Sequence, residues 1–307
     1  MEANIVIFGK SSIIAQNFIN KDFCRKVNFI NISRHSQYKK DIIFDIGQLI
    51  PTEILGKIAL QIKRRLTYKK TIFILFSWCG GPRNFSNIEE ISKTNINIIQ
   101  NLLSISELVL PSRIVFLSSA GALYPEGIKS YKFPETFTPS PKTSYGKQKY
   151  LAEKMLTNYS ETKKKNLLIL RISSAYGFDK RFSDQGVINK WLYSVVNNKK
   201  LKLYNSKESQ INFISFDQIS KAIIISIEKE LKGIYNIGSE NSISLSDVIE
   251  EIKKITNKKL ILEQVNNSKR YFNIETEKFI SKTGTKFKLN LRDNIKIIYN
   301  SINEISL

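Results

Sequence analysis

The residues best suited to chemistry are two adjacent serines, Ser118 and Ser119, and a tyrosine–lysine pair further along the chain, Tyr145 and Lys149. The tyrosine and the lysine are four residues apart, so on a helix they share one face. A lysine ammonium near a phenol favours the phenolate, and we expect it to lower the pKa of Tyr145 from its reference of about 10. Such a tyrosine exchanges a proton with a carbinol or carbonyl while a hydride moves to or from a nicotinamide. A neighbouring serine hydroxyl would hydrogen-bond the same oxygen.

The tyrosine–lysine spacing needs support from its surroundings, because chance alone predicts roughly two tyrosines with a basic residue four positions on. The tyrosines that have a lysine at that distance are Tyr145, Tyr150, Tyr159 and Tyr176. Only Tyr145 comes one strand–loop unit after the serine pair. It stands just after the turn-forming Pro139 and Pro141, in the first turn of a predicted helix. The context therefore selects Tyr145 and Lys149.

The elements that must position these residues alternate between short apolar runs and longer segments with apolar residues at helical spacing. The runs predict strands over 4–8, 27–32, 41–44, 72–76, 113–117 and 166–172. The helical pattern predicts helices over 13–23, 88–108 and 144–159. Strands that are apolar throughout are typical of a parallel sheet buried on both faces. The predicted fold class is therefore α/β, with a doubly wound, Rossmann-like parallel sheet.

The pattern becomes less regular from about residue 178, which predicts a smaller C-terminal lobe. Short strands are expected over 202–204, 211–214 and 233–237, and a helix over 246–256 that begins after an N-cap serine with Asp247 in its first turn. We place the dinucleotide-binding domain at 1–177, with a returning segment near 211–232. The substrate-binding lobe takes 178–210 and 233–307.

The turn after the first predicted strand has the small residues that a bound pyrophosphate requires. Gly9, Ser12 and Ala15 stand where a dinucleotide-binding fold has three glycines, so the chain can turn tightly before a helix N-terminus. Only the first of the three is glycine. An ordinary strand–turn–helix is the alternative interpretation.

The end of the second predicted strand indicates which cofactor is used. An NAD-specific fold has Asp or Glu near this point, and here the chain has Ser33, Arg34 and His35. Arg34 and Lys10 can approach a 2′-phosphate and Ser33 can donate to it, so NADP(H) is the predicted cofactor and NAD(H) the alternative. The competing interpretation makes these bases solvated surface charges, as we expect for His35. Asp45 is expected to accept from the adenine amino group or, alternatively, to cap a helix.

Composition limits the other classes of function. The 307 residues include 48 Lys+Arg and 27 Asp+Glu, a net charge of 48 − 27 = +21. The lysines are scattered, which favours a solvated surface over a nucleic-acid groove. Two cysteines, no signal-peptide pattern and apolar runs too short to span a bilayer predict a soluble, cytoplasmic protein without a membrane partner. No metal site is predicted.

The chain resembles the extended short-chain dehydrogenase/reductase superfamily, in its branch of nucleotide-sugar epimerases, dehydratases and ketoreductases. The resemblance covers most of the chain and includes Asn95 and the segments 117–124, 170–177, 212–217 and 233–238. It implies a catalytic trio of Ser119, Tyr145 and Lys149, with Ser118 as the alternative serine and Lys149 also holding the nicotinamide ribose. It further implies a homodimer formed through helices 88–108 and 144–159. We expect additional cofactor contacts from Ile13, Ile46 and Ser77.

The resemblance also implies where substrate binds. The family's C-terminal lobe holds the nucleoside diphosphate, and Arg270 matches a phosphate-contacting position. Tyr204 is expected to stack on the nucleobase or to fill the lobe core. Ser174 stands where the family usually has Asn, and a usual phosphate-binding Arg is replaced by Ile211. Two further expected substrate contacts are Ser118 and Gln185.

Two activities share this trio, so the trio cannot separate them. The first is an NADPH-dependent reductase of a nucleotide-linked 4-keto sugar, in deoxysugar or surface-polysaccharide synthesis. The alternative is a nucleotide-sugar 4-epimerase, which oxidises and re-reduces its substrate within one turnover. A dehydratase is disfavoured because Ala120 and Gly121 replace the Asp-Glu pair of that group. A further hypothesis, from another class, is a binding or regulatory protein that kept the fold and lost turnover, and the intact Ser/Tyr/Lys trio argues against it.

Overall fold

The computed structural model describes residues 2–21, 26–35, 40–81, 87–127, 129–178 and 186–305. The chain divides into two compact units. The first comprises Met1–Leu123, Pro139–Arg171 and Ile223–Tyr235, and the second comprises Tyr124–Thr138, Ile172–Ala222 and Asn236–Leu307. These units are defined by how compactly the chain packs and not by what each part binds. The boundaries of the dinucleotide-binding domain and of the substrate-binding lobe therefore stay a prediction.

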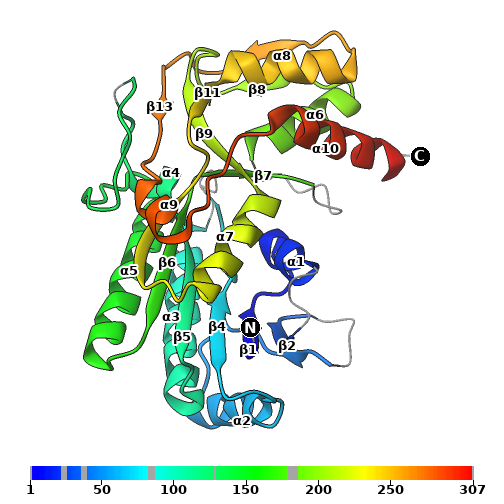
Figure 1. Cartoon of the computed structure of the whole chain (residues 1–307). Coiled ribbons are helices and arrows are strands. Elements are labelled where there is room, and N and C mark those ends of the chain that lie inside the picture. The colour runs from blue at the N-terminus through cyan, green and yellow to red at the C-terminus, as the bar shows by residue number, and fades with distance from the viewer. Residues whose placement is uncertain are drawn as a thin grey trace. The chain divides into compact units, whose positions relative to one another are not determined.

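The first unit is built on a seven-stranded parallel sheet (Figure 1), which confirms the predicted fold class. Its spatial order is β3-β2-β1-β4-β5-β6-β10. The strands are β1 (Ala3–Phe8), β2 (Val27–Ser33), β3 (Ile42–Ile43), β4 (Thr71–Leu75), β5 (Arg113–Ser119), β6 (Leu167–Ile172) and β10 (Gly233–Ile237). The order reverses direction between β1 and β4, which is where doubly wound sheets bind their ligands, beyond the carboxyl ends of the strands.

Helices cover both faces of this sheet because the strands are apolar on both sides. The helices are α1 (Ile13–Ile19), α2 (Thr52–Lys63), α3 (Ile88–Val109), α4 (Ala120–Leu123) and α5 (Ser144–Thr162). In Figure 1, α3 and α5 run side by side. The α2, α3 and α5 helices bury Leu55, Ile98 and Leu156 in one cluster with Ile30 and Ile32 of β2. Each fully buried side chain of this size contributes about 1.5–3 kcal/mol.

The opposite face of the sheet receives α1. Successive strand residues point to opposite faces, so Phe29 points away from the cluster that holds Ile30 and Ile32. The fully buried Phe18 of α1 meets the rings of Phe29 and Phe76, at centroid distances of 6.0 and 5.9 Å. This contact holds the short helix against the sheet.

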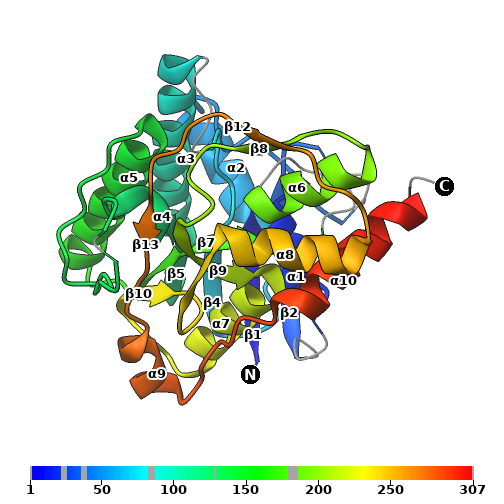
Figure 2. The same cartoon turned by 90° about the horizontal axis from the view of Figure 1, so that it is seen from above.

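The second unit contains two small sheets and a group of helices. The larger sheet has β11 (Ser242–Ser244), β9 (Gln210–Ser215) and β13 (Tyr271–Phe272) in that order, with β7 (Ser174–Tyr176) also paired to β9. The smaller pairs β12 (Leu262–Gln264) with β8 (Leu201–Leu203). The helices α6 (Val187–Val196), α8 (Leu245–Thr256) and α10 (Leu291–Ile305) pack together (Figure 2). The remaining helices are α9 (Glu277–Thr283) and α7 (Phe216–Glu228), which passes from this unit into the first.

Most predicted elements are present, and the differences concern their ends. The predicted helix 13–23 already ends at Ile19, because Asn20 leaves helical geometry (ψ 9°). The predicted strand 41–44 is reduced to Ile42–Ile43. The helix predicted over 246–256 begins at Leu245, and its N-cap is Ser244, whose hydroxyl accepts from the Asp247 N–H at 3.1 Å.

Candidate functional site

The catalytic candidates of the first unit lie where α5 meets the end of β5. Lys149 is only 5% exposed, and its Nζ donates to the Leu117 carbonyl at 2.9 Å, which joins the helix to the strand. Thr143 caps α5 by accepting from the Gly146 N–H at 3.1 Å. A Cβ at Gly146 would lie 2.3 Å from the Ala122 carbonyl, so the glycine after Tyr145 allows α5 to approach α4 closely.

The structure brings Ser119, Tyr145 and Lys149 together, as predicted from their order in the sequence. The Ser119 hydroxyl hydrogen-bonds to the Tyr145 phenol, which lowers the phenol pKa slightly, but burial dominates and raises it to about 12. Ser118 is the residue just before Ser119 in β5, and so it points to the other face of the sheet. Its buried hydroxyl has no hydrogen-bond partner in the part of the chain that the structure describes.

The pKa values of the pair correct the expectation that Lys149 makes Tyr145 acidic. Burial lowers the pKa of Lys149 to about 7, although Glu153 opposes this shift. A lysine whose charged form is destabilised by burial is not a fixed cation beside the phenol, so desolvation prevails at Tyr145 too. Tyr145 is therefore a protonated hydrogen-bond donor at neutral pH.

Aromatic rings surround the Lys149 ammonium, a feature that the sequence analysis missed. Its Nζ lies 3.9 Å from the ring centroid of Trp78, 4.7 Å from that of Phe116 and 5.9 Å from that of Tyr145. Trp78 follows β4 and is 71 residues before the lysine, so no local spacing indicates the contact.

A small open pocket beside Tyr145 is shaped by a polar network. Its lining consists of Cys79, Gly80, Gly81, Ile88, Ile91, Ser144, Tyr145 and Gln148. The Asn95 amide accepts from the Cys79 N–H at 2.9 Å and donates to the Cys79 carbonyl at 3.0 Å, so α3 fixes the loop after β4. Asn95 also donates to Gln148, which bonds to Ser144 at 2.9 Å.

The turn after β1 has the geometry that a dinucleotide requires. Gly9 has φ +93°, and a Cβ there would lie 2.5 Å from the Ser77 nitrogen. The N–H groups of Gly9 and Lys10 both donate to the Ile32 carbonyl, which closes the turn against β2. Ala15 is fully buried and lets α1 pack closely against the sheet. The first N–H groups of α1 have no partner within the helix, so the residues present fit a pyrophosphate.

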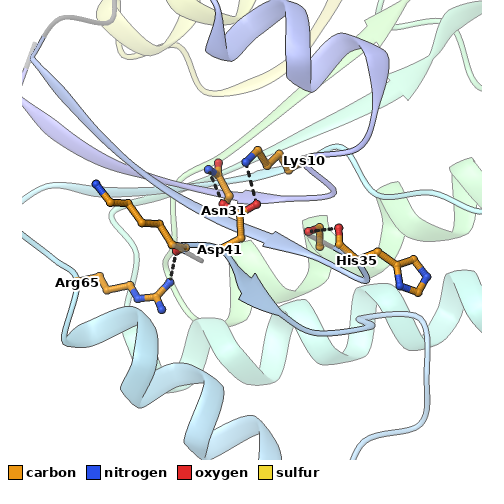
Figure 3. Close-up of polar contacts among 7 residues, drawn as sticks. Lys10, Asn31, His35, Asp41 and Arg65 are labelled. Atoms are coloured by element: carbon orange, nitrogen blue, oxygen red, sulfur yellow. Dashed lines mark hydrogen bonds and ion pairs between the residues drawn. The ribbon is translucent and has the colours of Figure 1, made fainter. Parts of the chain in front are cut away.

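An acid lies near the end of β2 after all, because the fold supplies one from elsewhere (Figure 3). Asp41 precedes β3, its side chain is 3% exposed, and it pairs with Lys10 at 2.8 Å. It also accepts from the Asn31 amide at 3.2 Å. The parallel pairing of β2 with β3 places Ile32 opposite Ile42 and so brings Asp41 beside Asn31. The expectation that no acid lies near the end of β2 is therefore wrong, and Lys10 already has a carboxylate partner.

The other predicted cofactor residues are accounted for as follows. The Ser33 hydroxyl donates to the His35 carbonyl at 3.0 Å, and both Arg34 and His35 are exposed. Asp45 accepts from the Gly47 N–H at 3.0 Å and from Gln48, so it closes a turn. The helix-capping interpretation is wrong, because the next helix, α2, begins only at Thr52 with Pro51 as its N-cap. Ile46 is buried, Ile13 opens α1, and the Ser77 N–H donates to the Phe8 carbonyl at 2.9 Å.

The substrate-binding predictions fall in the second unit. Ser174 is in β7, and Tyr204 follows β8 with 41% of its surface exposed. The Arg270 N–H donates to the Ser209 hydroxyl at 2.9 Å, and its guanidinium lies 5.7 Å from the Phe272 ring. Gln185 lies outside the described residues.

The position in β9 where the family usually has a phosphate-binding arginine is occupied here by a residue that packs in the interior. Ile211 is buried, and Asn212 is fully buried. The Asn212 amide donates to the Ser239 carbonyl at 2.8 Å and to the Asn273 amide oxygen at 2.9 Å. These residues tie β9 to its neighbours within the unit.

Two further properties concern only the described residues. Cys79 is a free thiol. The described helices include none that is long and apolar enough to cross a membrane, and the described His, Cys, Asp and Glu form no group that would hold a metal ion.

Comparisons with known sequences agree on one family. A model of the NAD dependent epimerase/dehydratase family matches residues 5–238. The chain is 34% identical to the dTDP-4-dehydro-6-deoxyglucose reductase of Escherichia coli over 152 residues, 49% of this chain and 48% of that protein. It is 22% identical to a putative UDP-glucose 4-epimerase of Methanocaldococcus jannaschii over 256 residues, 81% of each chain. The chain thus spans about half the length of the reductase that it matches.

Solved structures share the fold across the whole chain. The UDP-glucose 4-epimerase of Thermotoga maritima with UDP-glucose has a TM-score of 0.84 and 19% identity, covering 99% of this chain and 100% of that one. RMD from Pseudomonas aeruginosa complexed with NADPH has a TM-score of 0.80 and 16% identity, covering 98% and 99%. At these identities the likeness concerns the fold alone.

Proposed function

Because the chain belongs to the NAD dependent epimerase/dehydratase family, we propose that it is an NADPH-dependent reductase of a nucleotide-linked 4-keto sugar. The observation that carries the proposal is the Tyr145 phenol, which is hydrogen-bonded to Ser119 and stands one helical turn from the buried Lys149. The reductase of Escherichia coli, 34% identical over 152 residues, supports this choice of reaction.

The residues of the first unit divide the chemistry among them. When bound, the nicotinamide supplies the hydride that reduces the sugar carbonyl. Tyr145 donates its proton to the carbonyl oxygen as that oxygen gains negative charge, and Ser119 holds the phenol in line. Lys149 would hold the nicotinamide ribose. The phenol is protonated at neutral pH, as the proton donor of a reduction must be.

Cofactor preference rests on the bases near the end of β2. We propose NADP(H), with Arg34 as the principal contact of the 2′-phosphate. Lys10 would contribute only after leaving Asp41, to which it bonds at 2.8 Å. NAD(H) is the alternative, since the Thermus thermophilus epimerase of the same fold is a complex with NAD.

A 4-epimerase is the second candidate. It is favoured by the Methanocaldococcus relative, which matches over 81% of its length, and by several structural neighbours that are 4-epimerases. The same Ser119, Tyr145 and Lys149 would serve, with Tyr145 accepting and then returning the proton.

Assembly, location and pathway are part of the proposal. We propose a homodimer formed through α3 and α5, which carry the exposed apolar residues Ile88, Leu108 and Leu151. A reducing cytoplasm suits the free thiol of Cys79. The second unit would bind the nucleoside diphosphate through Arg270 and Tyr204, and the product would enter deoxysugar or surface-polysaccharide synthesis.

The two candidates differ in net cofactor use, which sets the test. The protein is incubated with NADPH and a panel of nucleotide-linked 4-keto and unmodified sugars, and the products are identified by NMR. A reductase consumes one NADPH for each 4-keto sugar reduced. Interconversion of unmodified sugars without net consumption would instead establish the epimerase.

A further inference from the structure

The buried ammonium of Lys149 lies against the face of an indole. Trp78 is the nearest ring, with its centroid 3.9 Å from Nζ, and Phe116 lies on another side at 4.7 Å. The Nζ also donates to the Leu117 carbonyl at 2.9 Å. Cations are attracted to the negative face of an aromatic ring, and Trp attracts them most strongly.

We infer that Trp78 is a positioning residue for Lys149, and that its indole face holds the ammonium at the end of β5. The consequence for turnover rests on the proposed function, whereas the contact itself does not. Trp78 comes from the loop after β4, so it links the lysine to the strand end that also faces the Gly9 turn.

The acid nearest to Lys149 along α5 is already engaged, which explains why an aromatic ring is needed. Glu153 is one helical turn further on and is 2% exposed. Arg171 binds it through two nitrogens, with Nη2 donating to Oε2 at 2.7 Å and Nε to Oε1 at 3.1 Å. A buried charge requires compensation, and Glu153 shares its charge between Arg171 and Lys149. The indole supplies compensation without adding another ionisable group.

The orientation of Trp78 supports the same inference. Its Nε1–H is buried and makes no hydrogen bond to the described residues. Buried indoles usually find a partner for this donor. Within the described residues, no hydrogen bond from this donor sets the orientation of the ring. The indole instead packs against Lys149, against Phe116, whose centroid is 5.8 Å away, and against the hydrophobic core cluster of the first unit.

Several ionisable groups face this cluster and must be distinguished from Lys149 in any titration. Tyr145 and Glu153 come from α5, Arg171 comes from β6, and Cys79 follows Trp78 in the loop after β4. The resonance of Lys149 itself must therefore be followed, so that none of these groups is mistaken for the lysine.

The test observes the lysine directly, with neither substrate nor cofactor present. Full-length protein is labelled with [¹³Cε]lysine, and the Lys149 resonance is assigned by its loss in Lys149→Met. We expect that resonance to be shifted upfield by the indole ring current and to titrate near pH 7. Trp78→Leu should abolish most of the upfield shift. It should also lower the titration midpoint of Lys149 by about one pH unit or more, because the charged ammonium loses the attraction of the indole face. Trp78→Phe should keep part of both effects.

Controls keep the test decisive. Trp191 is the chain's other tryptophan, is buried in α6 of the second unit and donates to the Lys202 carbonyl, so Trp191→Phe should change neither shift nor midpoint. If Trp78→Leu does not fold, fluorinated tryptophan in the Trp191→Phe background keeps the shape of Trp78 and weakens its negative face. The midpoint should then fall as fluorine is added.

An unchanged resonance and midpoint in folded Trp78→Leu, or a midpoint that ignores fluorination, would overturn the inference. The titration uses no substrate, so it can refute the role of Trp78 while the reductase assay supports the proposed function. It can equally support the role of Trp78 while the reductase assay refutes the proposed function. In the reductase assay, Trp78→Leu should lower kcat while leaving KM for the sugar nearly unchanged, and should move the pH profile in the same direction as the lysine midpoint.

Discussion

Removing one partner of the buried Glu153–Arg171 ion pair is expected to destabilise the protein strongly. Both side chains are 3% exposed, so neither charge can reach water once its partner is lost. The pair is bidentate, with nitrogen–oxygen distances of 2.7 and 3.1 Å. Breaking such a pair costs about 3–5 kcal/mol, a large part of the about 5–15 kcal/mol that stabilises a typical protein. Arg171→Met should therefore lower the free energy of unfolding by about 3–5 kcal/mol.

A double variant separates the cost of an orphaned charge from the worth of the pair. Glu153→Leu with Arg171→Met removes both charges and leaves apolar side chains between α5 and β6. This replacement should be more stable than either single variant, because neither Glu153 nor Arg171 is left buried as a charge without the other. An exposed pair on α3 is the matched control. Lys93 and Glu89 are 72% and 85% exposed, so Lys93→Met should cost about 0.3–0.5 kcal/mol.

Urea unfolding followed by circular dichroism measures the wild type, the two single variants Arg171→Met and Glu153→Leu, the double variant and the Lys93→Met control. The reasoning fails if Arg171→Met is as stable as Lys93→Met, or if the double variant is no more stable than the single ones. Either result would mean that water or another group compensates Glu153.

Three further predictions concern the turn, the cofactor and pH. Gly9→Ala places a Cβ 2.5 Å from a backbone nitrogen at φ +93°, so it should lower the melting temperature and weaken NADPH binding, whereas Gly56→Ala, with nothing within 4 Å, should do neither. Asp41→Asn releases Lys10 and should improve NADPH binding relative to NADH about fivefold in a fluorescence titration, and an unchanged ratio would contradict the pairing. The pKa of Lys149 falls from 10.5 to about 7 on folding, so between these values the unfolded chain binds more protons. As the pH rises through that window, the free energy of unfolding of the wild type should therefore increase, relative to that of Lys149→Met, by up to about 1.4 kcal/mol per pH unit. Plots of unfolding free energy against pH that run parallel for the two proteins would refute the assignment.

The fold could be predicted from the sequence because its signals are local. Strands buried on both faces are apolar throughout, as in 113–117 and 166–172, and the order of strands and helices then indicates the doubly wound sheet. The placement of Ser119, Tyr145 and Lys149 followed from the same order. Gly9 stands in the tight turn that the sequence pattern indicated after the first strand, and that turn leaves no room for a side chain.

What could not be predicted depends on contacts between distant residues. Asp41 reaches Lys10 only because β2 pairs with β3. The residues that directly follow β2 in the sequence include no acid, and the fold brings one there from just before β3. The Trp78–Lys149 contact joins the ends of two segments that have no common periodicity. The sign of the Tyr145 pKa shift was wrong because helical spacing gives the proximity of two groups but not the desolvation of both.

The central claim is that Tyr145 protonates the sugar oxygen while a hydride reaches the neighbouring carbon. The most direct measurement follows one turnover with NADPH deuterated at the transferable position, using a nucleotide-linked 4-keto sugar, in the wild type and in Tyr145→Phe. The account predicts one deuterium at carbon 4 of the product for each NADPH consumed, and a rate about a hundredfold or more lower in the variant with cofactor binding unchanged. Near-normal turnover by Tyr145→Phe, or a product without deuterium at carbon 4, would contradict it.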